Sequence, residues 1–214
     1  MTLGRRLPAL GHPAQTSVTG LRLYGRRVVI RPLAPADFRE WSEVRQHNES
    51  WLTPWEPLRA AHHPDPTIDR DAFASRCLAR DRDRQAGTGY AFGVLVANSV
   101  AGEVNLNNVV RGAQQSGTIG YWIDRRHAGQ SYVAEAVAVL AKFAFDELRL
   151  HRLEICIVPR NNNSRRVMDK LRIREEGTAQ RFLEINGVWE DHVRYGFTTE
   201  EFAARRQELA ERWL

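Results

Sequence analysis

The sequence predicts an α+β fold: a mixed, mostly antiparallel sheet of about seven strands, packed with helices. Runs rich in β-branched and aromatic residues at 90–97, 100–110 and 118–123 follow one another with short connections, as consecutive antiparallel strands do. The last run continues through a loop containing glycine into a helical pattern that reaches about residue 145. An Asn-Gly pair at 186–187 joins two further runs as a hairpin.

Length and composition favour one globular domain. The 214 residues suffice for one core, and 43% hydrophobic with 27% charged residues is an ordinary composition for such a domain. We expect residues 1–18 to form a flexible arm and residues 19–214 a single domain. No apolar run approaches the roughly 20 residues that span a bilayer, and the N-terminal stretch lacks the apolar segment of a secretory signal. Cys77 and Cys156 suggest reduced thiols, so we expect a cytoplasmic protein with no membrane association.

The positive charge favours acidic ligands. The chain has 31 Lys and Arg against 26 Asp and Glu, which gives a net charge of +5. Only Lys142 and Lys170 are lysines, and the arginines are spread along the chain rather than gathered in one tract. We therefore expect no direct recognition of nucleic acid as the main role.

The first part of the chain predicts a strand and two helices. Residues 21–33 form a strand or hairpin, after which Pro35 and Asp37 open a helix that ends near residues 47–48. Residues 50–57 (SWLTPWEP) should form a rigid aromatic loop, either a packed corner or a wall of a binding pocket. Residues 67–84 should form a charged helix with these side chains inward: Ile68, Phe73, Cys77 and Leu78.

The rest of the chain follows from turns and periodicity. Asn98-Ser99 and Arg111-Gly112 should be the turns between the central strands. Apolar residues at three- and four-residue spacing between Val133 and Leu148 predict a long helix. The remaining elements are a strand at 152–158, a helix that starts at 159–164 and runs to about Leu171, hairpin strands at 174–184 and 188–197, and a last helix capped by Thr199.

The loop at 124–131 is the first candidate site. A strand that passes through a glycine loop into a helix N-terminus gathers backbone N–H groups and the positive end of the helix dipole, which suits a pyrophosphate. The loop is neither a dinucleotide fingerprint nor a P-loop. An ordinary capped helix is the alternative.

Several motifs resemble the GCN5-related N-acetyltransferases. Residues 126–131 (RHAGQS) resemble their Arg/Gln-x-x-Gly-x-Gly/Ala loop, with Ser131 at the last position. The segments 120–123 (GYWI), 161–164 (NNNS) and 185–192 (INGVWEDH) agree, the last with the RimJ/RimL group of ribosomal-protein N-terminal acetyltransferases. Over about residues 20–200 the resemblance implies a three-layer fold, with helices on both faces of the sheet and splayed central strands.

One departure from the family lies at the end of the helix that begins near residue 162. Residues 170–173 (KLRI) stand where the family has Lys-Leu-Gly-Phe. We expect Arg172 to adopt the left-handed conformation there, at about 1 kcal/mol.

The resemblance implies acetyl-CoA as cosubstrate and direct attack of an amine on its thioester. Backbone N–H groups beside the splay would polarise the thioester carbonyl. Ser164 would protonate the departing thiolate, because Met168 occupies the position of the tyrosine that many relatives use; a serine bonded to the helix backbone is the alternative. Tyr121 is a lesser catalytic candidate, with core packing as its alternative. The residues implied in donor binding are Trp122, Ile123, Asp124, Arg126, His127, Ala128, Gly129, Gln130, Ser131, Tyr132, Asn161 and Ser164.

The acceptor implied by the resemblance is a protein N-terminus, in this group that of a ribosomal protein. An α-amino group has a pKa near 8, so only modest help from a base is needed. Glu103 is the carboxylate best placed for that role, and a solvent-facing cross-strand residue is the alternative. The residues implied in acceptor binding are Trp51, Trp55, Glu56, Asn105 and Asn108. No zinc-type ligand spacing occurs, so we expect no metal.

Other functions remain open at this point. The acceptor could be a small amine or an antibiotic, and the donor could be another acyl-CoA such as succinyl-CoA. A chain without turnover could be an acyl-CoA sensor or a ribosome-associated factor. The sequence does not distinguish a monomer from a homodimer.

Overall fold

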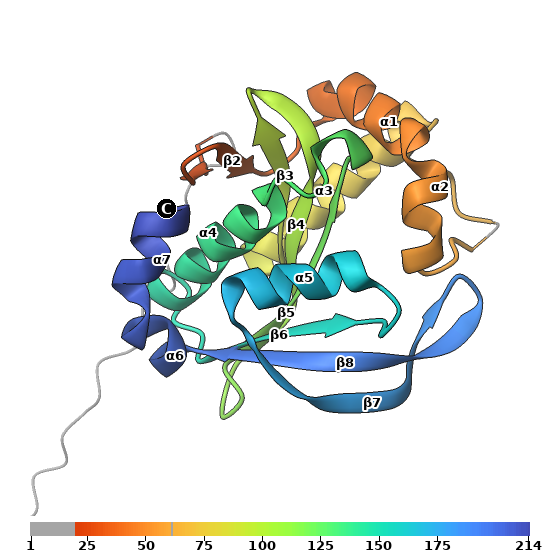
Figure 1. The fold of residues 1–214 in the computed structure, drawn as a ribbon. Coiled ribbons are helices and arrows are strands. Elements are labelled where there is room, and N and C mark those ends of the chain that lie inside the picture. Colours follow the sequence, from red (N-terminus) through yellow and green to blue (C-terminus); the bar gives the residue numbers. More distant parts are fainter. Residues whose placement is uncertain (1–19, 61) are drawn as a thin grey trace, which may run out of the picture.

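The computed structural model describes residues 20–60 and 62–214, which are built around one eight-stranded sheet (Figure 1). The strand order is β1-β2-β3-β4-β5-β6-β8-β7, and β5 with β6 is the one parallel pair in the described residues. The predicted α+β class and mixed, mostly antiparallel sheet are confirmed. The arm expected over residues 1–18 lies outside the described residues.

The elements have the following bounds. The strands are β1 (Leu23–Tyr24), β2 (Val28–Arg31), β3 (Tyr90–Val96), β4 (Ser99–Val110), β5 (Ser116–Ile123), β6 (Arg152–Ile157), β7 (Arg174–Ile185) and β8 (Val188–Thr198). The α-helices are α1 (Phe38–His47), α2 (Glu49–Leu52), α3 (Arg70–Ala86), α4 (Tyr132–Asp146), α5 (Asn162–Leu171), α6 (Thr199–Ala204) and α7 (Arg206–Trp213). Short 3-10 helices occur as η1 (Pro35–Asp37), η2 (Thr53–Trp55) and η3 (Arg125–His127).

Helix α4 is the centre of the main core. Its alanines, valines, leucine and phenylalanines are nearly all buried, and they pack with inward residues of the sheet, α5 and α7. Glu135 is a buried carboxylate on this helix, and it accepts hydrogen bonds from Arg27 Nε at 2.9 Å and from the Val28 N–H at 2.9 Å. These bonds fix the first turns of α4 to the start of β2.

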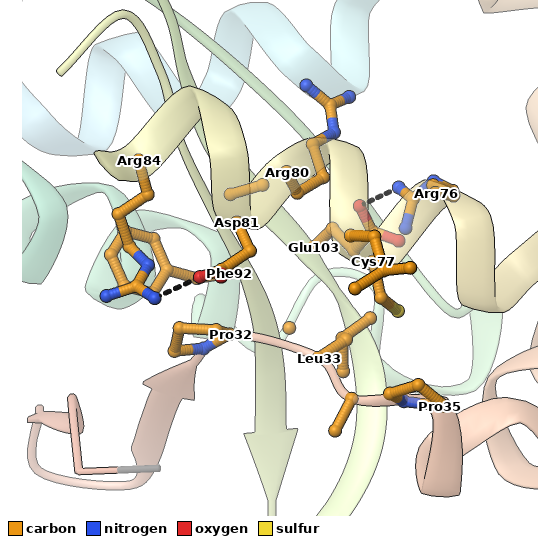
Figure 2. Close-up of a pocket in the computed structure, with 14 residues that line it drawn as sticks. Pro32, Leu33, Pro35, Arg76, Cys77, Arg80, Asp81, Arg84, Phe92 and Glu103 are labelled. Atoms are coloured by element: carbon orange, nitrogen blue, oxygen red, sulfur yellow. Dashed lines mark hydrogen bonds and ion pairs between the residues drawn. The ribbon is translucent and has the colours of Figure 1, made fainter. Parts of the chain in front are cut away.

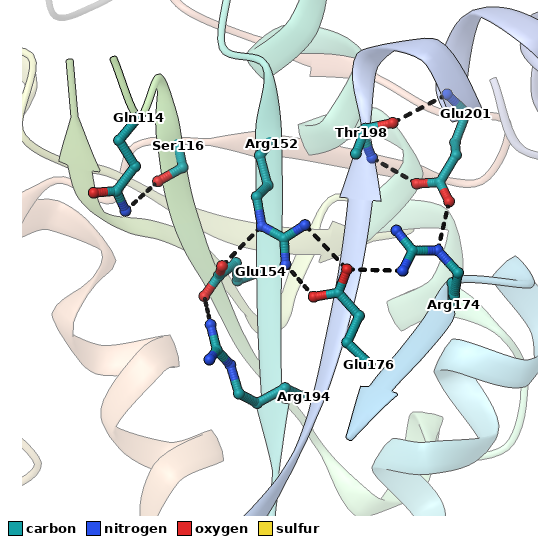
Figure 3. Close-up of polar contacts among 9 residues, drawn as sticks. All are labelled: Gln114, Ser116, Arg152, Glu154, Arg174, Glu176, Arg194, Thr198 and Glu201. Carbon is teal, nitrogen blue, oxygen red and sulfur yellow. Dashed lines mark hydrogen bonds and ion pairs between the residues drawn. The ribbon is translucent and has the colours of Figure 1, made fainter. Parts of the chain in front are cut away.

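Helices α1 and α3 cover the other face of the sheet beside β3 and β4. They enclose a smaller cluster that contains Trp41, Phe73, Cys77 and Val100, with Trp122 packed against it. Helices therefore lie on both faces, as the resemblance implies. Further along this face, over β6 to β8, charged side chains rather than helices cover the sheet (Figure 3).

The charged network in Figure 3 is a chain of alternating signs. Arg152 contacts Glu154 at 2.8 Å and also Glu176, and Arg194 contacts Glu154 at 2.9 Å. Arg174 links Glu176 to Glu201, at 2.9 and 3.0 Å. Because Glu154 and Glu176 each have two arginine partners and Glu201 has one, the half-buried charges stay compensated.

Three local predictions near the N-terminal half are wrong. Residues 50–57 are not one loop, since α2 and η2 make them helical as far as Trp55. Ile68 and Leu78 are 70% and 63% exposed rather than inward. Ile68 precedes α3, whose N-cap is Asp69, and Leu78 lies about 100° around the helix from the buried Cys77.

The β3–β4 turn and the cap of α6 lie within one residue of their predicted positions. The turn between β3 and β4 is at Ala97-Asn98, both with positive φ, rather than at 98–99. Thr198, not Thr199, caps α6, and its capping box with Glu201 explains the choice. The hairpin turn at Asn186-Gly187 is confirmed, and so is the left-handed conformation of Arg172, with φ of 50°.

Candidate active site

A cleft of about 390 Å³ opens between the end of β5, the first turn of α4, helix α5 and the α2–η2 segment. In Figure 1, α5 runs beside the β5–β6 region and α2 lies beyond its N-terminal end. Each wall therefore comes from a different part of the sequence, and the sheet brings them together.

The cleft begins where β5 and β6 separate. The two strands pair only from Ser116 to Thr118 with Arg152 to Glu154, although β5 continues to Ile123. The Asp124 N–H bonds to Ala101 of β4 at 2.7 Å, and alternate residues of a strand present their backbone groups to opposite sides. The N–H groups of Ile123 and Tyr121 therefore point toward β6, where the ladder has ended.

The loop between β5 and α4 has two residues in the left-handed region. Gly129 has φ of 79° and Ser131 has φ of 70°, a conformation that costs a serine roughly 1 kcal/mol. The Ser131 side chain makes no cap hydrogen bond to α4. The N–H groups in the first turn of α4 accordingly have no cap from this side chain and line the cleft wall formed by Ser131 to Ala134.

Asp124 and Arg126 shape this loop from within. Asp124 is fully buried, caps η3 through the Arg126 N–H at 3.0 Å, and binds the Arg126 guanidinium at 2.8 Å. Burial favours a higher pKa for Asp124, but the hydrogen bonds from Arg126 outweigh it, and the pKa lies below its usual value. Gln130 donates to the Arg126 carbonyl at 3.0 Å. None of these three residues is part of the cleft lining, and their predicted role in donor binding remains a prediction.

The remaining predicted residues of the loop reach the cleft. They are His127, Ala128, Gly129, Ser131 and Tyr132, together with Trp122 and Ile123 at the end of β5. The structure thus gathers the predicted donor residues around one space, apart from the three that hold the loop in shape.

Helix α5 contributes two cations that the sequence did not single out. Lys170 Nζ contacts Ser131 Oγ at 2.8 Å and the Gly129 carbonyl at 3.4 Å, and Arg166 has only a weak contact with Asn163 Oδ1 at 3.4 Å. Within the described residues neither has an acidic partner, whereas most arginines of the chain do. Two uncompensated cations beside free helix N–H groups form a site for a multiply charged anion.

Ser164 and Tyr121 meet at the N-terminal end of α5. Their hydroxyl oxygens are 2.8 Å apart, and the Tyr121 hydroxyl is 3.3 Å from the Ser164 carbonyl. Burial raises the pKa of Tyr121, so this hydroxyl keeps its proton. Asn161 caps the helix through the Ser164 N–H at 3.1 Å. The Ser164 hydroxyl is therefore bonded to a side chain rather than to the backbone of its own helix.

The opposite end of the cleft is aromatic. Trp51 and Trp55 line it, and Trp51 Nε1 donates to the Ile123 carbonyl at 3.2 Å. Glu56 is the one carboxylate of the lining among the described residues, and Arg45 binds it with two hydrogen bonds of 2.7 Å. The Arg45 guanidinium in turn lies 5.0 Å from the Trp122 ring. This end suits a small polar group held between aromatic walls.

Comparisons with known proteins agree with this geometry. Residues 27–174 match the family described as "Acetyltransferase (GNAT) domain". The chain is 34% identical over 172 residues to the "Probable N-acetyltransferase YjcK" of Bacillus subtilis, covering 79% of this chain and 93% of that protein.

This chain belongs to the GNAT acetyltransferase family.

Further relatives include ribosomal-protein acetyltransferases. The "[Ribosomal protein uS5]-alanine N-acetyltransferase" of Escherichia coli is 27% identical over 194 residues, or 90% of this chain and 98% of the relative. The structure of Mycobacterium smegmatis RimJ in complex with CoA-disulfide superposes with a TM-score of 0.80 at 30% identity, covering 89% of this chain and 95% of that one. The GNAT fold expected from the motifs is thereby confirmed.

Glu103 lies outside the GNAT cleft. Figure 2 shows it on the wall of a second pocket, beside Arg76 and Cys77 of α3. Its carboxylate accepts from Trp41 Nε1 at 2.5 Å and from Arg76 at 2.6 Å, and it is 2% exposed. It is therefore neither solvent-facing nor directed into the described cleft lining, and its role as a base remains a prediction.

The two asparagines predicted to bind the acceptor also lie outside the cleft lining. Asn105 accepts a hydrogen bond from the Phe92 N–H at 3.3 Å and lies 3.4 Å from Glu103. Asn108 is exposed in a bulge of β4, with φ of 51°. Their functional assignment rests on the resemblance alone.

Two further observations on the described residues concern membrane helices and metal ligands. None of their helices is long and apolar enough to cross a membrane. No group of three or more His, Cys, Asp or Glu side chains is arranged there to hold a metal ion.

Proposed function

We propose that this chain transfers the acetyl group of acetyl-CoA to the N-terminal amino group of a polypeptide, by likeness to its relatives that of a ribosomal protein. The observation that carries the proposal is the single cleft that joins an anion site at one end to a hydroxyl pair and an aromatic pocket at the other. Two relatives, the ribosomal-protein uS5-alanine N-acetyltransferase and RimJ, support a ribosomal protein as the acceptor by their names.

The anion end fits the diphosphate of a CoA ester. Gly129 places backbone N–H groups at the N-terminus of α4, and a side chain there would meet nothing within 4 Å, so the loop has open space in front of it. Lys170 and Arg166 supply charge that no acid of the described chain neutralises. The pantetheine arm would then run along β5, beside the N–H groups that β6 leaves free.

Bound acetyl-CoA supplies a thioester, whose acyl carbon forms an amide bond with the acceptor nitrogen while the thiol leaves. The Ile123 and Tyr121 N–H groups can polarise the acyl oxygen from the open edge of β5. The Ser164 hydroxyl can give its proton to the sulfur, and the proton that the acceptor nitrogen loses on forming the amide can return through solvent to the serine. Tyr121, whose pKa is raised by burial, stays protonated and holds the Ser164 hydroxyl in position from 2.8 Å away.

The aromatic end would hold the acceptor. Trp51 and Trp55 would exclude water around the entering amine. The carboxylate of Glu56 would attract the positive charge of the amine. Arg45 keeps Glu56 fixed in orientation, since both carboxylate oxygens are bound. An α-amino group with a pKa near 8 is partly neutral at pH 7, so this end needs to position the amine more than to deprotonate it.

A thiol-release assay tests the proposal. CoA release would be measured with acetyl-CoA and peptides that begin with alanine or serine, beside their N-blocked forms, lysine-only peptides and small amines. Release with the free peptides and none with the blocked forms is the expected result. Turnover confined to small amines would move the acceptor to that class, and tight binding without turnover on any acceptor would point to a sensor.

A further inference from the structure

Exposed apolar side chains gather at one place on the molecule, the tip of the β7–β8 hairpin. Nine large hydrophobic residues of the described chain are exposed, and five of them lie at this tip or beside it: Leu58, Phe182, Leu183, Val188 and Trp189. The other four are on separate elements: Tyr24, Ile68, Leu78 and Val110. A concentration of this kind on a globular surface indicates a binding site.

The hairpin tip is fixed against the acceptor end of the cleft. The Asn186 N–H donates to the Glu56 carbonyl at 2.9 Å, and a Cβ atom added at Gly187 would lie 3.1 Å from Leu58. Closer to the cleft, Arg160 forms an ion pair with Glu190, and its guanidinium lies 4.7 Å from the Trp55 ring. The tip is thus continuous with the wall that Trp55 and Glu56 form.

The two faces of the hairpin ribbon differ in what they meet. Val188 pairs with Ile185, and Glu190 pairs with Leu183, so these four side chains share one face. Ile185 is buried and Glu190 points to Arg160, which identifies this face as the one turned toward η2. We call Leu58, Leu183 and Val188, which are 42% to 60% exposed, the tip shelf. Trp189 pairs with Glu184 on the reverse face.

We propose that the tip shelf binds an apolar side chain of the acceptor polypeptide, a few residues after the amino group that is acetylated. The proposal rests on the proposed function. Leu58 follows the cleft-lining Glu56 by two residues, a separation of at most roughly 7 Å along an extended chain. An acceptor whose terminal amine lies near Glu56 reaches the shelf with its third to fifth residue.

The size of the shelf favours this occupant over a second copy of the chain. Each partner of a stable protein interface buries about 800 Å². Three partly exposed aliphatic side chains are too small for that, but they match one leucine or methionine of an extended peptide. Such a contact is made equally in the ground state and the transition state, so it lowers KM and leaves kcat unchanged.

A leucine scan tests the proposal. The host is a serine- and glycine-rich octapeptide with a free N-terminal alanine, and a single leucine is moved from its second to its seventh position. With the unmodified protein we expect kcat/KM to rise about five- to tenfold at one position between the third and the fifth, as burial of part of a leucine gives. The gain should appear as a lower KM, with kcat unchanged.

Two variants locate the gain on the protein, a double variant of the shelf and a control. Val188→Ser with Leu183→Ser should abolish the leucine gain and leave turnover of the leucine-free peptide unchanged. Trp189→Ser, on the reverse face of the same ribbon, is the matched control and should keep the gain. Acetyl-CoA affinity, measured by calorimetry, should be the same in both and shows that each variant is folded.

The outcomes distinguish failure of the tip shelf from failure of the proposed function. Turnover of all peptides without a leucine preference would overturn the tip shelf and leave N-terminal acetylation intact. A gain lost in Trp189→Ser but kept in the double variant would assign the contact to the reverse face and overturn the shelf as well. Absence of CoA release with every peptide would refute the proposed function, and the shelf proposal with it.

Discussion

Removing the Ser164 hydroxyl should slow turnover in a way that depends on pH. The substitution is Ser164→Ala, which leaves the cap bond between the Ser164 N–H and Asn161 in place because that bond uses the backbone. The Tyr121 hydroxyl loses its 2.8 Å partner and keeps only the backbone carbonyl at 3.3 Å. The fold of α5 is therefore preserved, and the change is confined to the hydroxyl pair.

The magnitude follows from the acidity of the leaving group. A thiol with a pKa near 8.5 lies about 1.5 units above pH 7, and each unit corresponds to about 1.4 kcal/mol. Proton delivery by Ser164 is then worth at most about 2 kcal/mol at pH 7, or about 30-fold in kcat. The advantage disappears as the pH rises past 8.5, because the thiolate can then leave without a proton. We expect the ratio of wild-type to variant kcat to fall toward one near pH 9.

Tyr121→Phe gives the complementary test. It removes one hydrogen bond to Ser164, which is worth about 1 kcal/mol and about fivefold in kcat. In the Ser164→Ala background it should have no further effect, because the group that it assists has gone. Asn162→Ala, an exposed neighbour in the same helical turn, is the control and should behave like the wild type.

The assay is CoA release under saturating substrates between pH 6 and 9.5, with acetyl-CoA affinity measured separately. A loss of kcat that is the same at every pH would refute proton delivery by Ser164. An equal loss in acetyl-CoA affinity would instead assign the serine to binding.

Three further predictions test the donor site, a helix end and a buried thiol. Lys170→Met should weaken acetyl-CoA binding about 10- to 100-fold, as loss of a charged hydrogen bond does, and the loss should be smaller at high salt. Lys142→Met, which removes the other lysine, should leave the calorimetric affinity for acetyl-CoA unchanged. Arg172→Gly should be more stable than Arg172→Ala by about 1 kcal/mol in urea unfolding, since both lose the ion pair with Glu208 but only glycine relieves the left-handed backbone; equal stabilities would contradict this. Burial raises the pKa of Cys77 to about 11, so its alkylation by iodoacetamide in a Cys156→Ser background should accelerate about tenfold per pH unit up to pH 11, and a plateau near pH 9 would be inconsistent with that environment.

Most residues predicted to bind the donor line one cleft, because they are close together in the sequence. Ile123, Gly129 and Tyr132 lie within ten residues of one another, and strand, loop and helix follow from their own patterns. The α5 cations could also have been found. Asn163, Arg166, Val167 and Lys170 recur at helical spacing, which places them on one face beside Ser164. What the local pattern could not show is that this face turns toward the loop.

The surroundings of Glu103 and Asp124 follow from contacts that their positions in the sequence pattern do not specify. The position of Glu103 on β4 is compatible with exposure, burial or catalysis, and the choice is made by Trp41 and Arg76, 62 and 27 residues earlier in the chain. Asp124 looks like a cleft residue by position, but its short side chain satisfies the backbone of η3 first. Local propensity and spacing therefore do not contain the contacts of Glu103, whereas the Asp124 contact is local and competes with a position facing the cleft.

The acceptor half is the least predictable part because three segments build it and none is sufficient alone. Trp55 and Glu56 are positioned by Arg45 of α1, by Arg160 before α5 and by Asn186 at the hairpin turn, so the pocket exists only once the whole sheet has formed. A substitution in any of the three segments can therefore alter acceptor choice while the loop at 126–132 stays unchanged. Relatives with this fold can share the donor chemistry and differ in acceptor, which is why the acceptor of this chain must be sought in the η2 segment and the hairpin tip rather than in the loop motif.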